Sequence, residues 1–272
     1  MKKKILNFIK DYIFLRKFLN KLRLVFKILN RQKINFKFLN YGQLSEARSI
    51  EMKNLLEDQI SKFKKTNRNT FILLEIGSYL GESLELFGDI LNKSETQFLI
   101  ISIDPYKKYT HENDDSADLH KIKNIIEDIY FYFIQNISLK SWRSNILHFR
   151  QNSNEALNLI KKLKISCDFI YIDGSHYYND IKNDYLNSKA ILSIHDNYKG
   201  KICGDDYEFS RNELEKIFND SSNLDKLLKL NKDYIHINKK NLKTGFHPGV
   251  TRFFSEIADK IIKTKSGFWY LE

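Results

Sequence analysis

Residues 71–83 read FILLEIGSYLGES, and this stretch constrains the fold more than any other part of the chain. The unbroken apolar run from Phe71 to Leu74 is typical of a strand buried on both faces of a parallel sheet. Gly77 and Gly81 then allow a sharp turn and a close approach of a ligand to the backbone. The helix that follows directs its first N–H groups at that ligand. The pattern predicts a pocket for a nucleotide-like cofactor at the end of the first strand.

The spacing of this turn narrows the kind of cofactor. Glu75-x-Gly77-x-x-x-Gly81 is not the Gly-x-Gly-x-x-Gly of dinucleotide enzymes, and the Lys-Ser/Thr pair of a P-loop is missing. An acid before the first glycine suits a positively charged ligand group better than a pyrophosphate. A second apolar run, residues 98–103, ends in Asp104, and an acid at the tip of strand two usually binds ribose hydroxyls.

Three further acids follow two later apolar runs. Residues 168–172 lead into Asp173, and residues 201–204 lead into Asp205 and Asp206. Carboxyl ends of neighbouring parallel strands meet at one edge of a sheet, where ligands bind in open α/β folds. Like charges there raise one another's pKa unless a cation or proton intervenes. A divalent ion with oxygen ligands, most simply Mg²⁺, resolves the repulsion, and helix capping by the adjacent acids is the alternative.

Together these motifs resemble the class I S-adenosylmethionine-dependent methyltransferases. The resemblance rests on EIGSYLGES, ISIDPY, IDGSHYYNDIKNDY and GDDY, and it extends over residues 42–272. The last two motifs are similar to a subgroup of sugar O-methyltransferases that includes macrocin-type enzymes. The resemblance implies a Rossmann-like, doubly wound α/β fold with a mostly parallel seven-stranded sheet whose last element is an antiparallel hairpin.

The resemblance also implies roles for individual residues. Asp173, Asp205 and Asp206 would hold Mg²⁺. Ser153 or Gln151 would contact the adenine ring, although Ser153 also suits a helix N-cap. The best-understood relatives have a second acid where this chain has His176. The residues expected to bind S-adenosylmethionine are Glu75, Gly77, Ser78, Gly81, Ser83, Asp104, Ser153 and Asp173.

Methyl transfer from a sulfonium is an in-line displacement, so the enzyme must align the acceptor oxygen, the methyl carbon and the sulfur. A sugar hydroxyl is a poor nucleophile near neutral pH. His176 can accept its proton, or a bound metal ion can lower its pKa. His176 and Asp173 are therefore the candidate catalytic residues, and a supporting hydrogen-bonding role for His176 remains open. His195 and His247 are candidates for lining the acceptor site.

The expected activity is O-methylation of a hydroxyl on a sugar, glycan or glycosylated metabolite. A metal-independent methyltransferase for another small molecule is one alternative. A non-catalytic scaffolding protein recruited by its N-terminal arm is another, and intact Glu75, Gly77, Gly81, Asp104 and Asp173 argue against it.

Positive charge is concentrated at the N-terminus. Residues 1–37 hold 12 Lys and Arg and one acid, a net charge of +11, which equals the net charge of the whole chain. Residues 38–272 are therefore neutral overall. A nucleic-acid substrate is not expected, because enzymes that act on nucleic acids carry a positive field around the active site.

The basic N-terminal segment also carries an apolar stripe. Its apolar residues recur in steps of three and four, which predicts an amphipathic helix. Such a helix can pair with a partner helix, pack on its own domain or lie on an anionic membrane. Lys and Arg interrupt it too often for a signal peptide or a transmembrane span. With two cysteines and no disulfide pattern, we expect a cytoplasmic enzyme, which the arm can hold at the inner face of the membrane.

Two domains are expected: the helical arm, residues 1–40, and the methyltransferase domain, residues 41–272. Residues 208–246 have no counterpart in the core fold and follow the Asp-Asp motif directly, so we expect a substrate lid there. Strands are expected near 71–76, 97–103, 145–149, 167–172, 200–204 and 267–271, with a weakly marked one at 260–264. Helices are expected near 44–63, 82–92, 117–137, 153–164, 177–192, 210–218, 223–230 and 249–261.

Overall fold

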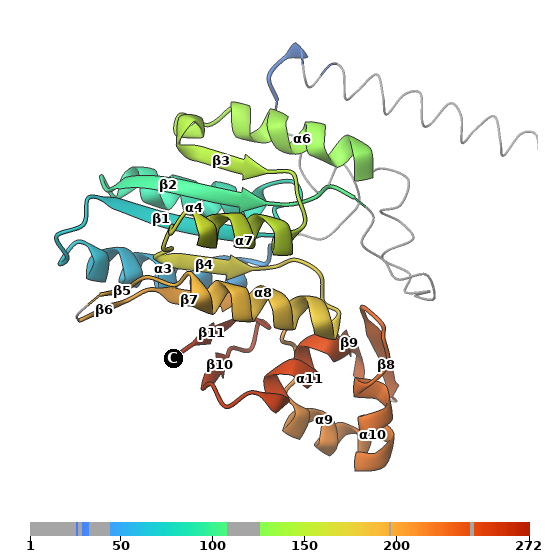
Figure 1. Ribbon diagram of the computed structural model, residues 1–272. Helices are drawn as coiled ribbons and strands as arrows, with labels where there is room; N and C mark the ends of the chain where they lie inside the picture. Colours follow the sequence, from blue (N-terminus) through green and yellow to red (C-terminus); the bar gives the residue numbers. More distant parts are fainter. Residues whose placement is uncertain (1–25, 27–28, 33–43, 108–125, 196, 240–241) are drawn as a thin grey trace, which may run out of the picture.

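The computed structural model describes residues 26, 29–32, 44–107, 126–195, 197–239 and 242–272 (Figure 1). The expected helical arm, residues 1–40, lies outside the described residues except for the first two of these stretches. Two members of its apolar stripe are described, Phe26 and Leu29, and they are 63% and 76% exposed. Contact of the arm with a membrane or a partner helix stays a prediction.

A seven-stranded sheet forms the centre of the molecule, as predicted. Neighbouring strands are parallel except at β11, which runs antiparallel to both of its neighbours. The expected antiparallel hairpin at the end of the chain is therefore confirmed. In spatial order the strands are β10 (Ile261–Lys263), β11 (Trp269–Leu271), β7 (Lys201–Gly204), β4 (Phe169–Ile172), β1 (Thr70–Ile76), β2 (Gln97–Ile103) and β3 (Ile146–Phe149).

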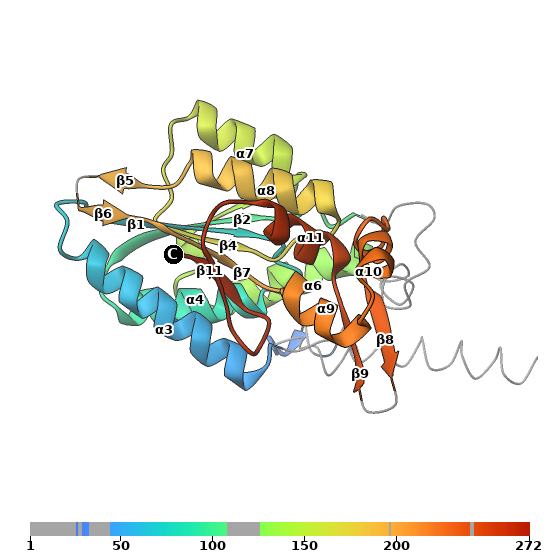
Figure 2. The ribbon, with the colours of Figure 1, turned by 90° about the horizontal axis from the view of Figure 1, so that it is seen from below.

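Helices cover both faces of the sheet, as Figure 2 shows. One layer holds α3 (Glu46–Phe63), α4 (Glu82–Lys93) and α6 (Ile126–Ser138), and the other holds α7 (Ser153–Lys162), α8 (Tyr178–Ala190) and α11 (Pro248–Glu256). Side chains of β1 pack against both helical layers, because successive side chains of a strand point to opposite faces of the sheet. Phe71 and Leu73 pack with the first layer, whereas Leu74 and Ile76 pack with the second.

Some boundaries differ from the expected ones. Helix α11 ends at Glu256 rather than near residue 261, and the start of the helix expected at 117–137 lies outside the described residues. A small hairpin of β5 (Ile194–His195) and β6 (Tyr198–Lys199) was not predicted, because two-residue strands carry no readable periodicity. Among the described residues, no helix combines the length and the apolar character that crossing a bilayer requires.

The segment 208–246 folds as a compact unit beside α11. It contains α9 (Arg211–Phe218), α10 (Ser221–Leu228) and an antiparallel hairpin of β8 (Ile235–Lys239) and β9 (Leu242–Phe246). Neither strand of this hairpin was predicted. The unit has its own small core, formed by Leu214, Leu224, Leu228, Ile237 and Phe246. Its role as a lid stays a prediction.

Candidate active site

A cavity of about 930 Å³ lies at the carboxyl ends of the central strands. Its wall includes residues that directly follow β1, β2, β4 and β7, together with Leu44 and Arg48 at the start of α3. Turns after parallel strands converge at this edge because all the strands run in the same direction. The expected convergence of the strand-end residues is therefore present.

The turn after β1 depends on Gly77. Its φ is +88°, and a β-carbon there would lie 1.9 Å from the carbonyl oxygen of Asp173. Only glycine allows the ends of β1 and β4 to come this close. Gly81 has a φ of +82° and is the N-cap of α4, but it does not line the cavity. The structure gives Gly81 a conformational role, and its contact with a cofactor stays a prediction.

Asp104, at the end of β2, faces the cavity and also organises the turn. Its carboxylate accepts hydrogen bonds from the backbone N–H groups of Ser78 at 3.1 Å, Tyr79 at 2.9 Å and Tyr106 at 2.7 Å. Burial raises the pKa of Asp104 above its ordinary value, although these three bonds oppose the rise. A ribose would have to share a carboxylate that already holds the β1 turn in place.

Glu75 lies beneath the cavity rather than on its wall. The side chain is fully buried, accepts a hydrogen bond from the Ser83 hydroxyl at 2.5 Å, and is not a lining residue. Burial raises its pKa to about 7. Glu75 points to the α4 side of β1, as the alternation of a strand requires. Ser78 and Ser83 line the cavity, and their contact with a cofactor stays a prediction.

Ser153 lines the cavity but is not the N-cap of α7. That position belongs to Asn152, and Ser153 is the first helical residue. Its hydroxyl hydrogen-bonds instead to Asp184 of α8, whose pKa burial raises to about 7. Asp184 is not among the site residues predicted from the sequence. Its place one residue before the buried Tyr185 and three after Ile181 is the helical spacing that could have identified it.

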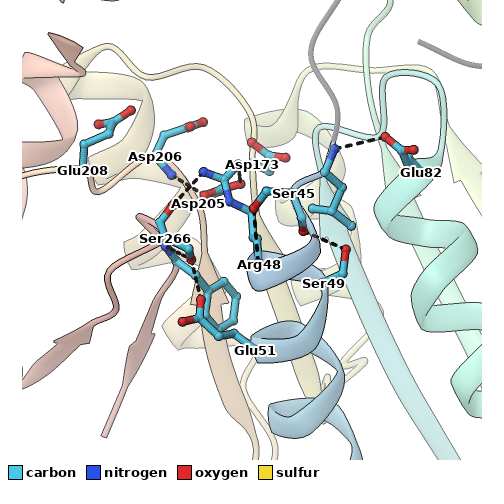
Figure 3. Close-up of polar contacts among 12 residues, drawn as sticks. Ser45, Arg48, Ser49, Glu51, Glu82, Asp173, Asp205, Asp206, Glu208 and Ser266 are labelled. Carbon is cyan, nitrogen blue, oxygen red and sulfur yellow. Dashed lines mark hydrogen bonds and ion pairs between the residues drawn. The ribbon is translucent and has the colours of Figure 1, made fainter. Parts of the chain in front are cut away.

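Asp205, one of the three acids of the predicted magnesium triad, has a partner within the chain. Arg48 forms an ion pair with the Asp205 carboxylate, and its Nη2 donates to the carbonyl oxygen of Ser266 at 3.0 Å (Figure 3). Ser45 caps α3 and so fixes the turn that carries Arg48. Asp206 has a left-handed backbone, with φ of +65°, and its carboxylate contacts His176 instead. The adjacent acids therefore serve different partners.

His176 lies between two carboxylates. Its Nε2 is 2.8 Å from Asp206 Oδ2, and its Nδ1 is 3.1 Å from Asp233 Oδ1. Burial disfavours the imidazolium, but the charges of Asp233 and Asp206 outweigh burial and raise the pKa of His176 well above its ordinary value. A protonated imidazole has no lone pair to accept a proton, so His176 can act as a base only after losing this proton.

His247 joins the cluster from the start of α11. Its Nδ1 is 2.8 Å from Glu208 Oε1, and the centroids of the His176 and His247 rings are 4.1 Å apart. His247 is predicted from the sequence only as a residue lining the acceptor site, and Glu208 and Asp233 are not predicted. Both acids belong to the 208–246 segment, where no local motif marks them. His195, in contrast, is exposed on the β5–β6 hairpin, at the opposite end of the sheet in Figure 1.

Among the described residues, three overlapping groups of side chains in this cluster have the spacing of metal ligands. Ligand atoms of Asp173, His176 and Asp206 lie within 4.8 Å of one another, and the same holds for two overlapping sets. Burial and the charges of Asp206 and Asp205 raise the pKa of Asp173 well above its ordinary value. The overlapping sets are His176, Asp233 and His247, and Asp206, Glu208 and His247.

Residues 74–207 match a family described as a methyltransferase domain. The solved structure of the O-methyltransferase NovP is 14% identical, over 83% of this chain and 78% of that one, with a TM-score of 0.49. The calicheamicin methyltransferase CalS11 is 12% identical, over 85% and 92%, with a TM-score of 0.42. A methyltransferase from Agrobacterium tumefaciens is 11% identical, over 63% and 47%, with a TM-score of 0.40. No curated protein sequence matches the chain significantly.

Proposed function

Because the chain is an S-adenosylmethionine-dependent methyltransferase, we propose that it methylates a hydroxyl group of a sugar, a glycan or a glycosylated metabolite, with a divalent cation at the His176–Asp206 cluster. One observation carries the proposal. A single cavity joins the turn after β1, which suits the cofactor, to the imidazole and carboxylate cluster, which suits a hydroxyl acceptor.

The cofactor half of the cavity fits S-adenosylmethionine. Gly77 at the β1 turn lines the cavity, and so do Glu82 and Ser83 in the first turn of α4, the end of a helix that favours polar and anionic ligand groups. The volume of about 930 Å³ is within the range of small-molecule sites and leaves room for an acceptor. The cofactor supplies a methyl group on a sulfonium. Asp104 would meet its ribose and Ser153 its adenine.

The acceptor half of the cavity is lined by charged and ionisable side chains. Asp173 lines the cavity between the cofactor turn and the cluster, so an acceptor hydroxyl beside it would lie next to the methyl donor. Asp173, His176 and Asp206 would hold a divalent cation, which lowers the pKa of a hydroxyl bound to it. The 208–246 segment contributes Asp233 and Glu208 to the wall, and closure there would exclude water.

A metal-independent methyltransferase is the second candidate, and one observation favours it. The acids are already neutralised in part by the chain itself, through Arg48 at Asp205 and through the imidazolium of His176 at Asp206. Under this alternative the same cavity binds the same cofactor, and chelators leave methyl transfer unchanged. The two candidates thus differ in one measurable property.

The test begins with calorimetric titration of S-adenosylmethionine into the full-length protein. Saturable binding that Gly77→Ala abolishes would support the cofactor half. Methyl transfer is then followed with a labelled methyl group on a panel of nucleotide sugars, glycosides, catechols and RNA, each with divalent ions and with chelator. Labelled sugar products that disappear with chelator support the proposal. Cofactor binding with label only on other acceptors would contradict it, and chelator-resistant transfer would establish the second candidate.

A further inference from the structure

We propose that the cation of this site is a transition-metal ion of the Mn²⁺, Fe²⁺, Co²⁺ or Zn²⁺ class, bound by His176 and His247 together with Asp206 and Asp173. The sequence had indicated Mg²⁺ held by carboxylates alone. The inference deepens the proposed function by naming the ligands and the class of ion. Its test requires neither cofactor nor acceptor, so it can fail or succeed independently of methyl transfer.

The two imidazoles are held in the way that metal-binding histidines are held. Asp233 Oδ1 lies 3.1 Å from Nδ1 of His176, and Glu208 Oε1 lies 2.8 Å from Nδ1 of His247. A carboxylate at one ring nitrogen orients the imidazole, fixes its tautomer and raises the basicity of the other nitrogen. Nε2 of each ring is then the atom that would bind an ion, and in His176 this atom already faces the Asp206 carboxylate.

The spacing of the inner groups is that of ligands around one ion. Nε2 of His176 is 2.8 Å from Oδ2 of Asp206. Two atoms bound at about 2.0–2.2 Å and at right angles to each other are about 3 Å apart. The ring centroids of His176 and His247 are 4.1 Å apart, which places the second imidazole beside the same position.

The fold brings His247 here through the sequence His247-Pro248-Gly249. Pro248 occupies the first turn of α11, where its missing N–H costs nothing. A β-carbon on Gly249 would lie 2.3 Å from the carbonyl oxygen of His176, so glycine lets α11 pack directly on that backbone. His247 is the N-cap of α11, but its side chain makes no capping bond, which leaves the imidazole to the cluster.

The composition of the site favours a transition metal over Mg²⁺. Imidazole nitrogen suits zinc, iron and similar ions, whereas Mg²⁺ prefers oxygen ligands and retains much of its water. Arg48 occupies Asp205, and Figure 3 shows its guanidinium directed to that carboxylate. Asp205, the third carboxylate that a magnesium site would use, is therefore already paired with Arg48. The imidazoles of His176 and His247 would supply the remaining ligands instead.

The test is direct metal binding to the full-length protein after treatment with chelator. Co²⁺ is titrated while visible absorption is recorded, and Mg²⁺ is titrated by calorimetry. We expect one Co²⁺ per chain with d–d absorption bands that report nitrogen ligation, and no displacement by a 100-fold excess of Mg²⁺. His247→Gln should weaken Co²⁺ binding about tenfold or more. His195→Gln, on the exposed β5–β6 hairpin, is the matched control and should bind as the wild type does.

A second variant covers loss of folding in the first. Glu208→Gln keeps the shape of the side chain and weakens the support of His247, so it should lower Co²⁺ affinity while thermal unfolding shows a folded protein. Co²⁺ affinity unchanged in both folded variants would overturn the inference, as would equal competition by Mg²⁺. Metal binding without sugar methylation would refute the proposed acceptor and leave the metal site in place.

Discussion

The guanidinium of Arg48 pairs with the carboxylate of Asp205, and this contact joins the helix before the first strand to the end of β7. The same helix holds the terminal hairpin, because Arg48 donates to the Ser266 carbonyl and Glu51 accepts from Thr264 at 2.9 Å. Helix α3 is therefore part of the cavity wall and also fixes the edge of the sheet beside it (Figure 3).

Arg48→Met should destabilise the protein by about 3 kcal/mol, because Asp205 would be left buried without its counter-charge. Urea unfolding at pH 7 measures the change. Lys62→Met on the same helix is the control, since its pair with Asp58 is half-exposed and should contribute less than about 1 kcal/mol. Equal effects of the two variants would show that the Arg48 pair is not a buried interaction. The double variant with Asp205→Asn should recover part of the loss.

Gly77→Ala should destabilise the protein by roughly 3 kcal/mol or more and abolish cofactor binding. Its β-carbon would overlap the backbone of Asp173, so β1 and β4 would have to separate. Gly267→Ala is the control that measures the cost of a positive φ without steric overlap. Gly267 has a similar φ of +89°, but its nearest neighbour would be 3.6 Å away, so the expected cost is about 1 kcal/mol. Thermal unfolding and calorimetric titration of the cofactor would record both effects.

Glu75→Gln should stabilise the protein increasingly as the pH rises. The pKa of Glu75 is raised to about 7 in the folded state from about 4.5, so the folded protein holds the proton more tightly. The stability that this proton provides is lost as the pH rises through the folded pKa. Glutamine does not titrate, and the gain of the variant over the wild type should grow by about 2–3 kcal/mol between pH 5 and pH 8. Urea unfolding at both values is the measurement, and a pH-independent difference would mean that Glu75 titrates normally.

Gly249→Ala should move the start of α11 away from His176, because the added methyl group meets the His176 carbonyl oxygen and the Tyr178 nitrogen. We expect weaker Co²⁺ binding and a loss of about 2 kcal/mol of stability. Ser255→Ala, on the exposed side of the same helix, is the control and should change neither. Wild-type Co²⁺ affinity in a folded Gly249→Ala protein would separate the helix position from the metal site.

Deletion of residues 1–37 should abolish binding to vesicles that contain anionic lipid, because this segment carries the whole net charge of +11. Vesicle flotation at low and physiological salt measures the effect, and cofactor titration of the truncated protein checks that the domain is folded. Unchanged flotation after deletion would favour a partner helix as the target of the arm.

The positions of the main elements could be predicted from the sequence because the signals are local. A buried strand needs an unbroken apolar run, as in Phe71–Leu74, and a sharp turn into a helix needs glycine, as at Gly77. The acids at strand ends could be assigned to one edge of the sheet, since parallel strands share their direction. The two-residue strands β5 and β6 carried too little pattern to be predicted.

Side-chain partners were decided only by the tertiary structure. Adjacent Asp205 and Asp206 look equivalent along the chain, yet Arg48 takes the first and His176 the second. The rings of His176 and His247 lie side by side because Gly249 allows α11 to pack closely against the backbone of the loop that follows β4. Backbone preferences act over a few neighbouring residues, so they can be recognised in the sequence. Ion pairs and metal-ligand sets depend on how segments distant in the sequence pack together, and a local sequence pattern does not contain that information.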